Sequence, residues 1–123
     1  MKYSVGVDIE DISRFEKMAK AKDKETLSTI YTELERKYCF SKAKPSQHLA
    51  AKFAGKEAVI KALRAFGHTE YYSSVEIKNK KSGVPNVKLL NKKLGKKFDI
   101  AISLSHCKDK AIAFAVAVLK GKR

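Results

Sequence analysis

The sequence of 123 residues contains no tryptophan and only two prolines and two cysteines. The two cysteines, Cys39 and Cys107, do not have the spacing of metal ligands and need not pair with each other. This scarcity agrees with a reducing compartment.

The sequence also lacks an apolar run long enough to cross a bilayer. Its longest apolar run, residues 111–119, is too short for this. The first ten residues, MKYSVGVDIE, carry charges where a signal peptide would need its apolar stretch. We therefore expect a cytoplasmic protein.

Acidic residues are few: 13 aspartates and glutamates stand against 27 lysines and arginines, which gives a formal net charge of +14. Such an excess predicts an anionic partner, which is a nucleic acid, a membrane surface, a phosphate-rich small molecule or an acidic protein. Charge alone does not choose among them. Since 44% of the residues are hydrophobic, length and composition predict a single domain with one core over residues 1–123.

Residues 3–10 alternate between apolar and small or polar side chains, which is the pattern of a half-buried β-strand. Ser4 and Gly6 share a face with Asp8 and leave room there for something larger than a side chain. Asp11 is expected to cap a helix over residues 12–21. Asp8 therefore lies where a strand gives way to a helix, and by itself it needs no role beyond that turn.

Residues 49–67 predict a helix that is apolar or small around most of its circumference, which is typical of a buried helix. Glu57, Lys61 and Arg64 interrupt this pattern and fall in one narrow sector. Two explanations are open. A Glu57–Lys61 pair would contribute only about 0.2–0.5 kcal/mol on an exposed helix, whereas the alternative is that both groups face a charged ligand in a cleft.

The remaining elements follow from periodicity and from capping and turn residues. Thr32 and Glu35 have the spacing of a capping box, Ser46 can cap the long helix and Gly67 can end it. We expect two short helices within residues 23–40, strands at 75–78, 86–90, 99–105 and 111–119, and a basic helical turn at 91–97. The last strand is apolar on both faces and should lie centrally in a sheet or against another subunit. These elements predict an α+β fold, with a small, mostly antiparallel sheet packed against one long helix and several short helices.

Several common motifs are excluded. Gly55-Lys56 does not belong to a P-loop, because Ala50 stands where the first glycine is required and Glu57 where Ser or Thr would hold Mg²⁺. The three histidines have no zinc-type spacing, and no nucleophile elbow is present. No helix-turn-helix, RRM or KH signature accompanies the basic charge.

The chemistry that remains is carried by Asp8, Glu57, Lys61 and the segment SLSH at 103–106. Two carboxylates from different elements, with lysines nearby, suit a Mg²⁺ ion on a phosphate-bearing substrate. Mg²⁺ usually takes only one or two oxygens from carboxylates and the rest from water and phosphate, so two carboxylates suffice.

Three blocks of sequence follow one another along the chain. They are Gly6-Val7-Asp8-Ile9 with Arg14-Phe15, then Phe53-Ala54-Gly55-Lys56-Glu57-Ala58 with Lys61-Ala62, and then Ser103-Leu104-Ser105-His106. In order, spacing and chain length this pattern resembles the acyl carrier protein synthases, the short, single-domain 4′-phosphopantetheinyl transferases. The resemblance implies that fold and a Mg²⁺-dependent reaction of fatty acid biosynthesis. In this reaction the phosphopantetheine arm passes from coenzyme A to a serine of an apo acyl carrier protein, and adenosine 3′,5′-bisphosphate is released.

The resemblance also implies roles for individual residues. Asp8 and Glu57 match the metal-binding carboxylates, and Lys61 matches the lysine that faces the pyrophosphate. The expected catalytic residues are therefore Asp8, Glu57 and Lys61. Glu57 is our preferred base for the serine proton, and water is the alternative. Lys61 would stabilise charge that develops on the phosphoryl oxygens.

Other matches concern the substrates. Lys52 and His106 match positions that contact the 3′-phosphate end of coenzyme A, although the family usually has arginine at the first, and residues 82–85 resemble the loop along the nucleotide and pantetheine. The expected coenzyme A residues are Lys52, Gly83, Pro85, Ser105 and His106, and Arg14 matches an arginine that docks the carrier protein. The family's Gly-Thr-Gly after the long helix is replaced by Arg64-Ala65-Phe66-Gly67, and Arg64 has no assigned role.

The implied partner explains the charge. Acyl carrier proteins are acidic as a class, so a positive surface would steer the encounter. The short family members are homotrimers with sites between subunits, and residues 111–119 supply an apolar surface for such contacts. No nucleic acid or membrane partner is expected.

Two alternatives stay open on the sequence. A small basic nucleic-acid-binding domain without catalysis is allowed by the charge and opposed by the missing motifs. A non-catalytic subunit that only binds a carrier protein is opposed by the presence of Asp8, Glu57 and Lys61 together.

Overall fold

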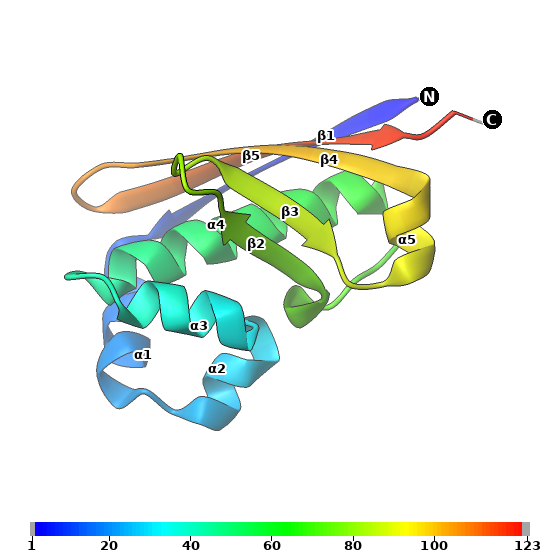
Figure 1. Cartoon of the computed structure of the whole chain (residues 1–123). Helices are drawn as coiled ribbons and strands as arrows, with labels where there is room; N and C mark the ends of the chain where they lie inside the picture. The colour runs from blue at the N-terminus through cyan, green and yellow to red at the C-terminus, as the bar shows by residue number, and fades with distance from the viewer. Residues whose placement is uncertain (1, 122–123) are drawn as a thin grey trace.

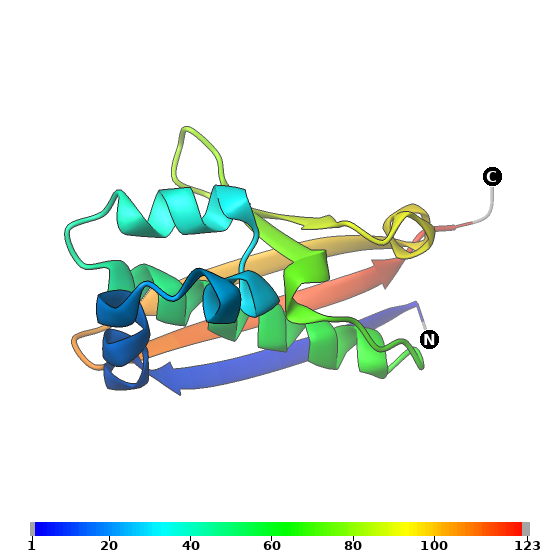
Figure 2. The same ribbon diagram turned by 90° about the horizontal axis from the view of Figure 1, so that it is seen from below.

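The computed structural model describes residues 2–121, and its main layer is an antiparallel sheet of three strands in the order β1-β5-β4. These strands are β1 (Tyr3–Asp11), β4 (Phe98–His106) and β5 (Lys110–Leu119). The long helix α4 (Pro45–Arg64) lies along one face of the sheet, as Figures 1 and 2 show from two directions. The α+β class and the central position of the last strand are therefore confirmed.

Helix α4 approaches the sheet closely because it turns small residues toward it. Ala54, Ala58 and Ala62 are fully buried, and a Cβ atom added at Gly6 of β1 would lie 1.8 Å from the carbonyl oxygen of Ala58. Ser4 of the same strand donates from its hydroxyl to the carbonyl oxygen of Ala62 over 2.5 Å. The room that Ser4 and Gly6 leave is filled by the backbone of α4.

The apolar face of β1 points away from α4. The strand is half-buried, as its alternation predicted, but the buried side carries the small residues and the exposed side the large apolar ones. This face continues on β5, where Val7 pairs with Phe114 and Val5 with Val116. We call it the outer apolar face, and it consists of Tyr3, Val5, Val7, Ile9, Ile112, Phe114, Val116 and Val118.

A second, two-stranded sheet packs on α4 away from β1, as Figure 1 shows. It is the antiparallel hairpin of β2 (Val75–Asn79) and β3 (Pro85–Leu89), followed by α5 (Lys92–Lys97). The contact is tight, since a Cβ atom at Gly55 of α4 would lie 2.4 Å from Cδ1 of Ile77. The observed strands and α5 begin and end within one residue of the predicted bounds.

Short helices cover the remaining side of α4. They are η1 (Ile12–Phe15), α1 (Glu16–Ala21), α2 (Lys24–Ile30) and α3 (Glu33–Phe40), with the 3₁₀ turn η2 (Tyr72–Ser74) between α4 and β2. The helix predicted over 12–21 is thus a 3₁₀ turn followed by α1. Asp11 stands at the N-cap position of η1, as predicted, but its side chain makes no capping hydrogen bond and instead pairs with Lys110 at 2.5 Å. The capping box of Thr32 and Glu35 is confirmed.

Of the two predictions for the ends of α4, one is wrong and the other is confirmed. Pro45 is the first helical residue, so the prediction that Ser46 caps the helix is wrong. Proline suits this position because the N–H it lacks would have no helical partner there. At the other end Gly67 has a φ of 84°, and the N–H groups of Gly67 and His68 donate to the carbonyls of Arg64 and Leu63 in a Schellman arrangement. Gly67 therefore ends the helix as expected.

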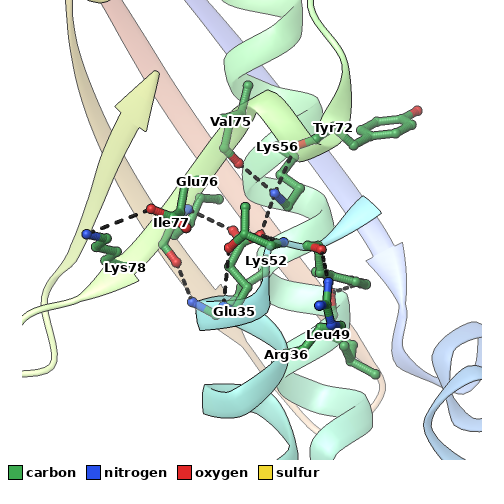
Figure 3. A network of polar contacts seen from close by, with 12 residues as sticks. Glu35, Arg36, Leu49, Lys52, Lys56, Tyr72, Val75, Glu76, Ile77 and Lys78 are labelled. Carbon is green, nitrogen blue, oxygen red and sulfur yellow. Dashed lines mark hydrogen bonds and ion pairs between the residues drawn. The ribbon is translucent and has the colours of Figure 1, made fainter. Parts of the chain in front are cut away.

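A buried ion pair ties the helices to the second sheet. Nζ of Lys56 lies 2.7 Å from Oε1 of Glu35, and both side chains are fully buried. Lys56 also donates to the carbonyls of Tyr72 and Val75, while Glu35 accepts from the N–H of Ile77 (Figure 3). Each charge is thus surrounded by hydrogen-bond partners, which a buried charge requires.

Two further features bear on the environment of the protein. Cys39 is buried, Cys107 is exposed, and both are free. Within residues 2–121, no helix has the length and apolar character needed to cross a membrane.

Candidate active site

Asp8 and Lys61 meet where α4 crosses β1. Oδ1 of Asp8 lies 3.5 Å from Nζ of Lys61, which also donates to the carbonyl oxygen of Val7 at 3.0 Å. Oδ2 of Asp8 is buried and has no hydrogen-bond partner unless the neighbouring Glu10 carboxyl group carries a proton. A buried carboxylate oxygen without a partner is costly, so this atom needs a proton or a cation.

Glu10 adds a second carboxyl group beside Asp8. Side chains two residues apart on a strand point to the same face, and the Glu10 side chain is only 10% exposed. Burial raises the pKa of Glu10 to about 7, with a further contribution from the adjacent Asp8 carboxylate. Arg14 partly opposes this rise, since its guanidinium lies 2.6 Å from Oε1 of Glu10. Two carboxyl groups therefore share a poorly solvated region with a cation next to each.

Glu57 and Lys61 contact different neighbours in the fold. Oε1 of Glu57 accepts a hydrogen bond from the hydroxyl of Tyr72 in η2. This bond, together with burial, raises the pKa of Tyr72 to about 12, so the phenol keeps its proton and acts as the donor. Glu57, Tyr72 and Arg64 line a small cavity of about 190 Å³.

The charged strip of α4 is therefore divided between two neighbours. Lys61 reaches β1 and pairs with Asp8, while Glu57 and Arg64 line the cavity beside η2. Glu57 and Lys61 form no ion pair with each other, so the simpler explanation of the strip does not hold in the folded chain.

The carboxylates suit a magnesium ion. Among residues 2–121, no three His, Cys, Asp or Glu side chains gather as a metal site. Mg²⁺ nevertheless needs only one or two carboxylates, because water and substrate phosphate supply its other oxygens. The unpartnered Oδ2 of Asp8 is an oxygen that a cation would satisfy. Asp8 and Glu57 stay the predicted ligands.

Lys52 lies inside the protein rather than at its surface. The residue is only 2% exposed, and Nζ donates to the carbonyl oxygen of Ile77 at 2.7 Å and to Oδ1 of Asn79 at 2.9 Å. Asn79 in turn donates to the carbonyl oxygen of Gly83. Lys52 therefore supports the β2–β3 turn, in which Gly83 has a φ of 90° and after which Pro85 begins β3.

Ser105 and His106 are exposed at the end of β4. Burial lowers the pKa of His48, and the neighbouring Lys42, His106 and Lys52 lower it further. The side chains of Lys42, Lys52 and His106 are therefore close enough to His48 for an electrostatic interaction. His106 is exposed and can reach a phosphate group, whereas Lys52 is buried with its ammonium group bonded to Ile77 and Asn79, so the direct phosphate contact predicted for Lys52 does not fit this structure.

Two residues of the site were not predicted. Glu10 could have been predicted, because it lies on the same face of the alternating strand as Asp8. Tyr72 could not have been predicted from the sequence, because it lies in a turn 15 residues from Glu57 and contacts it only in the folded chain.

The family model of the 4′-phosphopantetheinyl transferase superfamily matches residues 4–117 of the chain. This match covers the sheet, α4 and the acidic site. The chain therefore belongs to the 4′-phosphopantetheinyl transferase superfamily.

Similar proteins give a narrower grouping. A holo-[acyl-carrier-protein] synthase of Thermodesulfovibrio yellowstonii is 44% identical over 115 residues, which are 91% of this chain and 95% of that protein. The synthase of Neisseria meningitidis has a solved structure with a TM-score of 0.78 and 28% identity, over 95% of this chain and 98% of that one. The synthase of Helicobacter pylori, solved in complex with coenzyme A, has a TM-score of 0.75 and 28% identity, over 94% and 99%. The chain groups with the holo-[acyl-carrier-protein] synthases and is an enzyme, a phosphopantetheinyl transferase.

Proposed function

We propose that the chain performs its family's reaction at Asp8, Glu57 and Lys61. The reaction transfers 4′-phosphopantetheine from coenzyme A to a serine of an apo acyl carrier protein and releases adenosine 3′,5′-bisphosphate. The observation that carries the site is the buried, unpartnered Oδ2 of Asp8 beside the ammonium group of Lys61. Such an arrangement suits a bound cation and an anionic substrate. As expected from the sequence, we assign the reaction to the cytoplasm.

Each of the three residues has a separate task. Asp8 and Glu57 would hold Mg²⁺, which would supply neutralising charge for the pyrophosphate of coenzyme A. Lys61, whose side chain is 46% exposed, binds the pyrophosphate oxygens and stabilises the charge that develops on them. Glu57 accepts the serine proton as the serine oxygen bonds to the phosphorus that carries pantetheine. The bond from this phosphorus to the bridging oxygen breaks, and its electron pair leaves with adenosine 3′,5′-bisphosphate.

We assign the nucleotide end of coenzyme A to the end of β4 and the β2–β3 turn. His106 and Ser105 are exposed at the end of β4 and can donate to a phosphate, and Gly83 and Pro85 shape the β2–β3 turn. Lys52 is bonded inside the protein, so in this proposal it contributes its charge and the support of the turn.

The carrier protein is assigned to the side of η1. The side chain of Arg14 is 63% exposed, although it is paired with Glu10. Its guanidinium lies 5.3 Å from the ring centre of Phe53 and 5.6 Å from that of Phe15, which limits its motion. Arg14 thus offers a preformed positive group to an acidic partner.

The outer apolar face is assigned to contacts between copies of the chain in a homotrimer. Its residues include Tyr3, Val5 and Ile9, which are more than half exposed in a single chain. A contiguous apolar surface of this kind marks an interaction site. Light scattering should give the mass of a trimer for the protein, and Phe114→Lys should lower it. A monomeric mass for active wild-type protein would rule out sites shared between subunits.

The test of the function is one incubation with coenzyme A, Mg²⁺ and an apo carrier protein, followed by mass spectrometry. The wild-type protein should add one phosphopantetheine group to the carrier. Asp8→Asn and Lys61→Met should each lose most of this activity while folding normally. An established synthase serves as positive control, and an unmodified carrier with the wild-type protein would overturn the proposal.

A further inference from the structure

Tyr72 holds an unusual position, because it contacts two successive residues of α4. Its hydroxyl donates to Oε1 of Glu57, and its carbonyl oxygen accepts from Nζ of Lys56 at 2.9 Å. The bond to Glu57 joins a residue of the turn η2 to the carboxylate to which we assign metal binding and proton transfer.

The phenol is held in place from several sides. Its ring lies 5.0 Å from that of Phe53, and Phe53 lies 5.4 Å from Phe15. Lys56, which fixes the carbonyl, is itself buried against Glu35 (Figure 3). Both the ring and the backbone of Tyr72 are thus anchored to the core, so its hydroxyl is offered to Glu57 from a fixed point.

Glu57 would otherwise be free to rotate. Within residues 2–121 Tyr72 is the one side chain that donates a hydrogen bond to the Glu57 carboxylate, because Lys61 is engaged with Val7 and Asp8. A carboxylate with one oxygen hydrogen-bonded is restricted in its rotation. Metal-ligating carboxylates are commonly fixed in this way, and losing the outer partner typically costs about 10- to 100-fold in metal affinity or activity.

We propose that Tyr72 is a positioning residue for Glu57. Its hydroxyl occupies Oε1 and leaves Oε2 as the oxygen that faces the metal. This inference rests on the proposed function of Glu57, and it assigns to the η2 turn a part in the reaction beyond packing.

The decisive variant is Tyr72→Phe, which removes the hydroxyl and keeps the ring on Phe53. Tyr71→Phe is the matched control, because Tyr71 is the neighbouring residue and is 79% exposed. Mn²⁺ binding to each variant is measured by electron paramagnetic resonance in the absence of substrates, and kcat and the carrier KM are measured at several Mg²⁺ concentrations.

We expect Tyr72→Phe to bind Mn²⁺ about 10- to 100-fold more weakly, and to need more Mg²⁺ for half-maximal activity, with little change in the carrier KM. Tyr71→Phe should match the wild-type protein. Tyr72→Leu, which also removes the ring, should lose about as much Mn²⁺ affinity as Tyr72→Phe.

Two results would overturn the inference. One is wild-type Mn²⁺ affinity and kcat in Tyr72→Phe, and the other is a loss that appears only in Tyr72→Leu, since packing alone would then matter. In both cases a loss of Mn²⁺ binding in Asp8→Asn would leave the proposed metal site standing. If the wild-type protein itself bound no Mn²⁺, both the metal site and the role of Tyr72 would be refuted.

Discussion

At the scale of single residues, the charge state of Glu10 is set by its surroundings. Its pKa of about 7 is caused first by burial and then by Asp8. The folded chain therefore holds a proton on this carboxyl group at a pH at which the unfolded chain, with its ordinary value of 4.5, has released it.

This difference predicts a pH dependence of stability. Because the folded state binds the extra proton between about pH 4.5 and pH 7, the contribution of Glu10 to the free energy of unfolding falls as the pH rises through that window. Replacing Glu10 with Gln should remove this part of the fall. Denaturant unfolding at pH 5 and pH 8, in the presence of EDTA, compares the two proteins.

Other groups titrate in the same range, so the difference between the two proteins is the informative quantity. The wild-type protein should lose more stability between the two pH values than Glu10→Gln. Equal losses would show that Glu10 keeps an ordinary pKa.

At the scale of elements, the contact between β1 and α4 depends on a missing side chain. Gly6→Ala would put a Cβ atom 1.8 Å from the carbonyl oxygen of Ala58, an atom of the helix backbone that has no freedom to turn aside. We expect a loss of about 3 kcal/mol in unfolding free energy, as for a severely overpacked core. Denaturant unfolding measures it.

Gly121→Ala is the control, because nothing lies within 4 Å of a Cβ atom there. It should unfold like the wild-type protein. If Gly6→Ala did so too, the close approach of β1 and α4 would be incorrect.

The packing of α3 and β2 on α4 depends on the buried ion pair of Glu35 and Lys56. Glu35→Leu leaves the ammonium group of Lys56 buried without its partner, so we expect a loss of about 3–5 kcal/mol in unfolding free energy. The double variant Glu35→Leu/Lys56→Met should be more stable than the single variant, because it removes the uncompensated charge. Thermal and denaturant unfolding test both, and a single variant with wild-type stability would contradict the burial of the pair.

At the scale of the whole molecule, the net charge of +14 acts on the encounter with the carrier protein. Long-range attraction is screened by salt, with a Debye length of about 10 Å at 0.1 M ionic strength. The carrier KM should therefore rise about tenfold between 0.05 and 0.5 M NaCl, while kcat changes much less. Steady-state kinetics across this range tests the prediction.

A carrier variant with fewer acidic residues is the control for this effect. Its KM should respond less to salt than that of the natural carrier. A carrier KM that is independent of salt would show that the positive surface does not steer this partner.

The sequence by itself determined most of the secondary structure and the location of the main candidate groups. The strands and α5 follow from local alternation and turn residues, and they begin and end within one residue of the prediction. The capping box of Thr32 and Glu35 and the end of α4 at Gly67 are equally local. Asp8, Glu57 and Lys61 could be singled out because the short blocks in which they stand, weak one by one, together resemble those of a known family.

The tertiary structure decided which groups meet. Alternation in β1 showed two faces, but only the close approach of α4 to Gly6 decided that the small face is the buried one. Lys61 forms an ion pair with Asp8 rather than with Glu57, and Glu57 accepts a hydrogen bond from Tyr72. These outcomes depend on how near two packed backbones come and on residues far apart in the chain, and local periodicity carries no information about either.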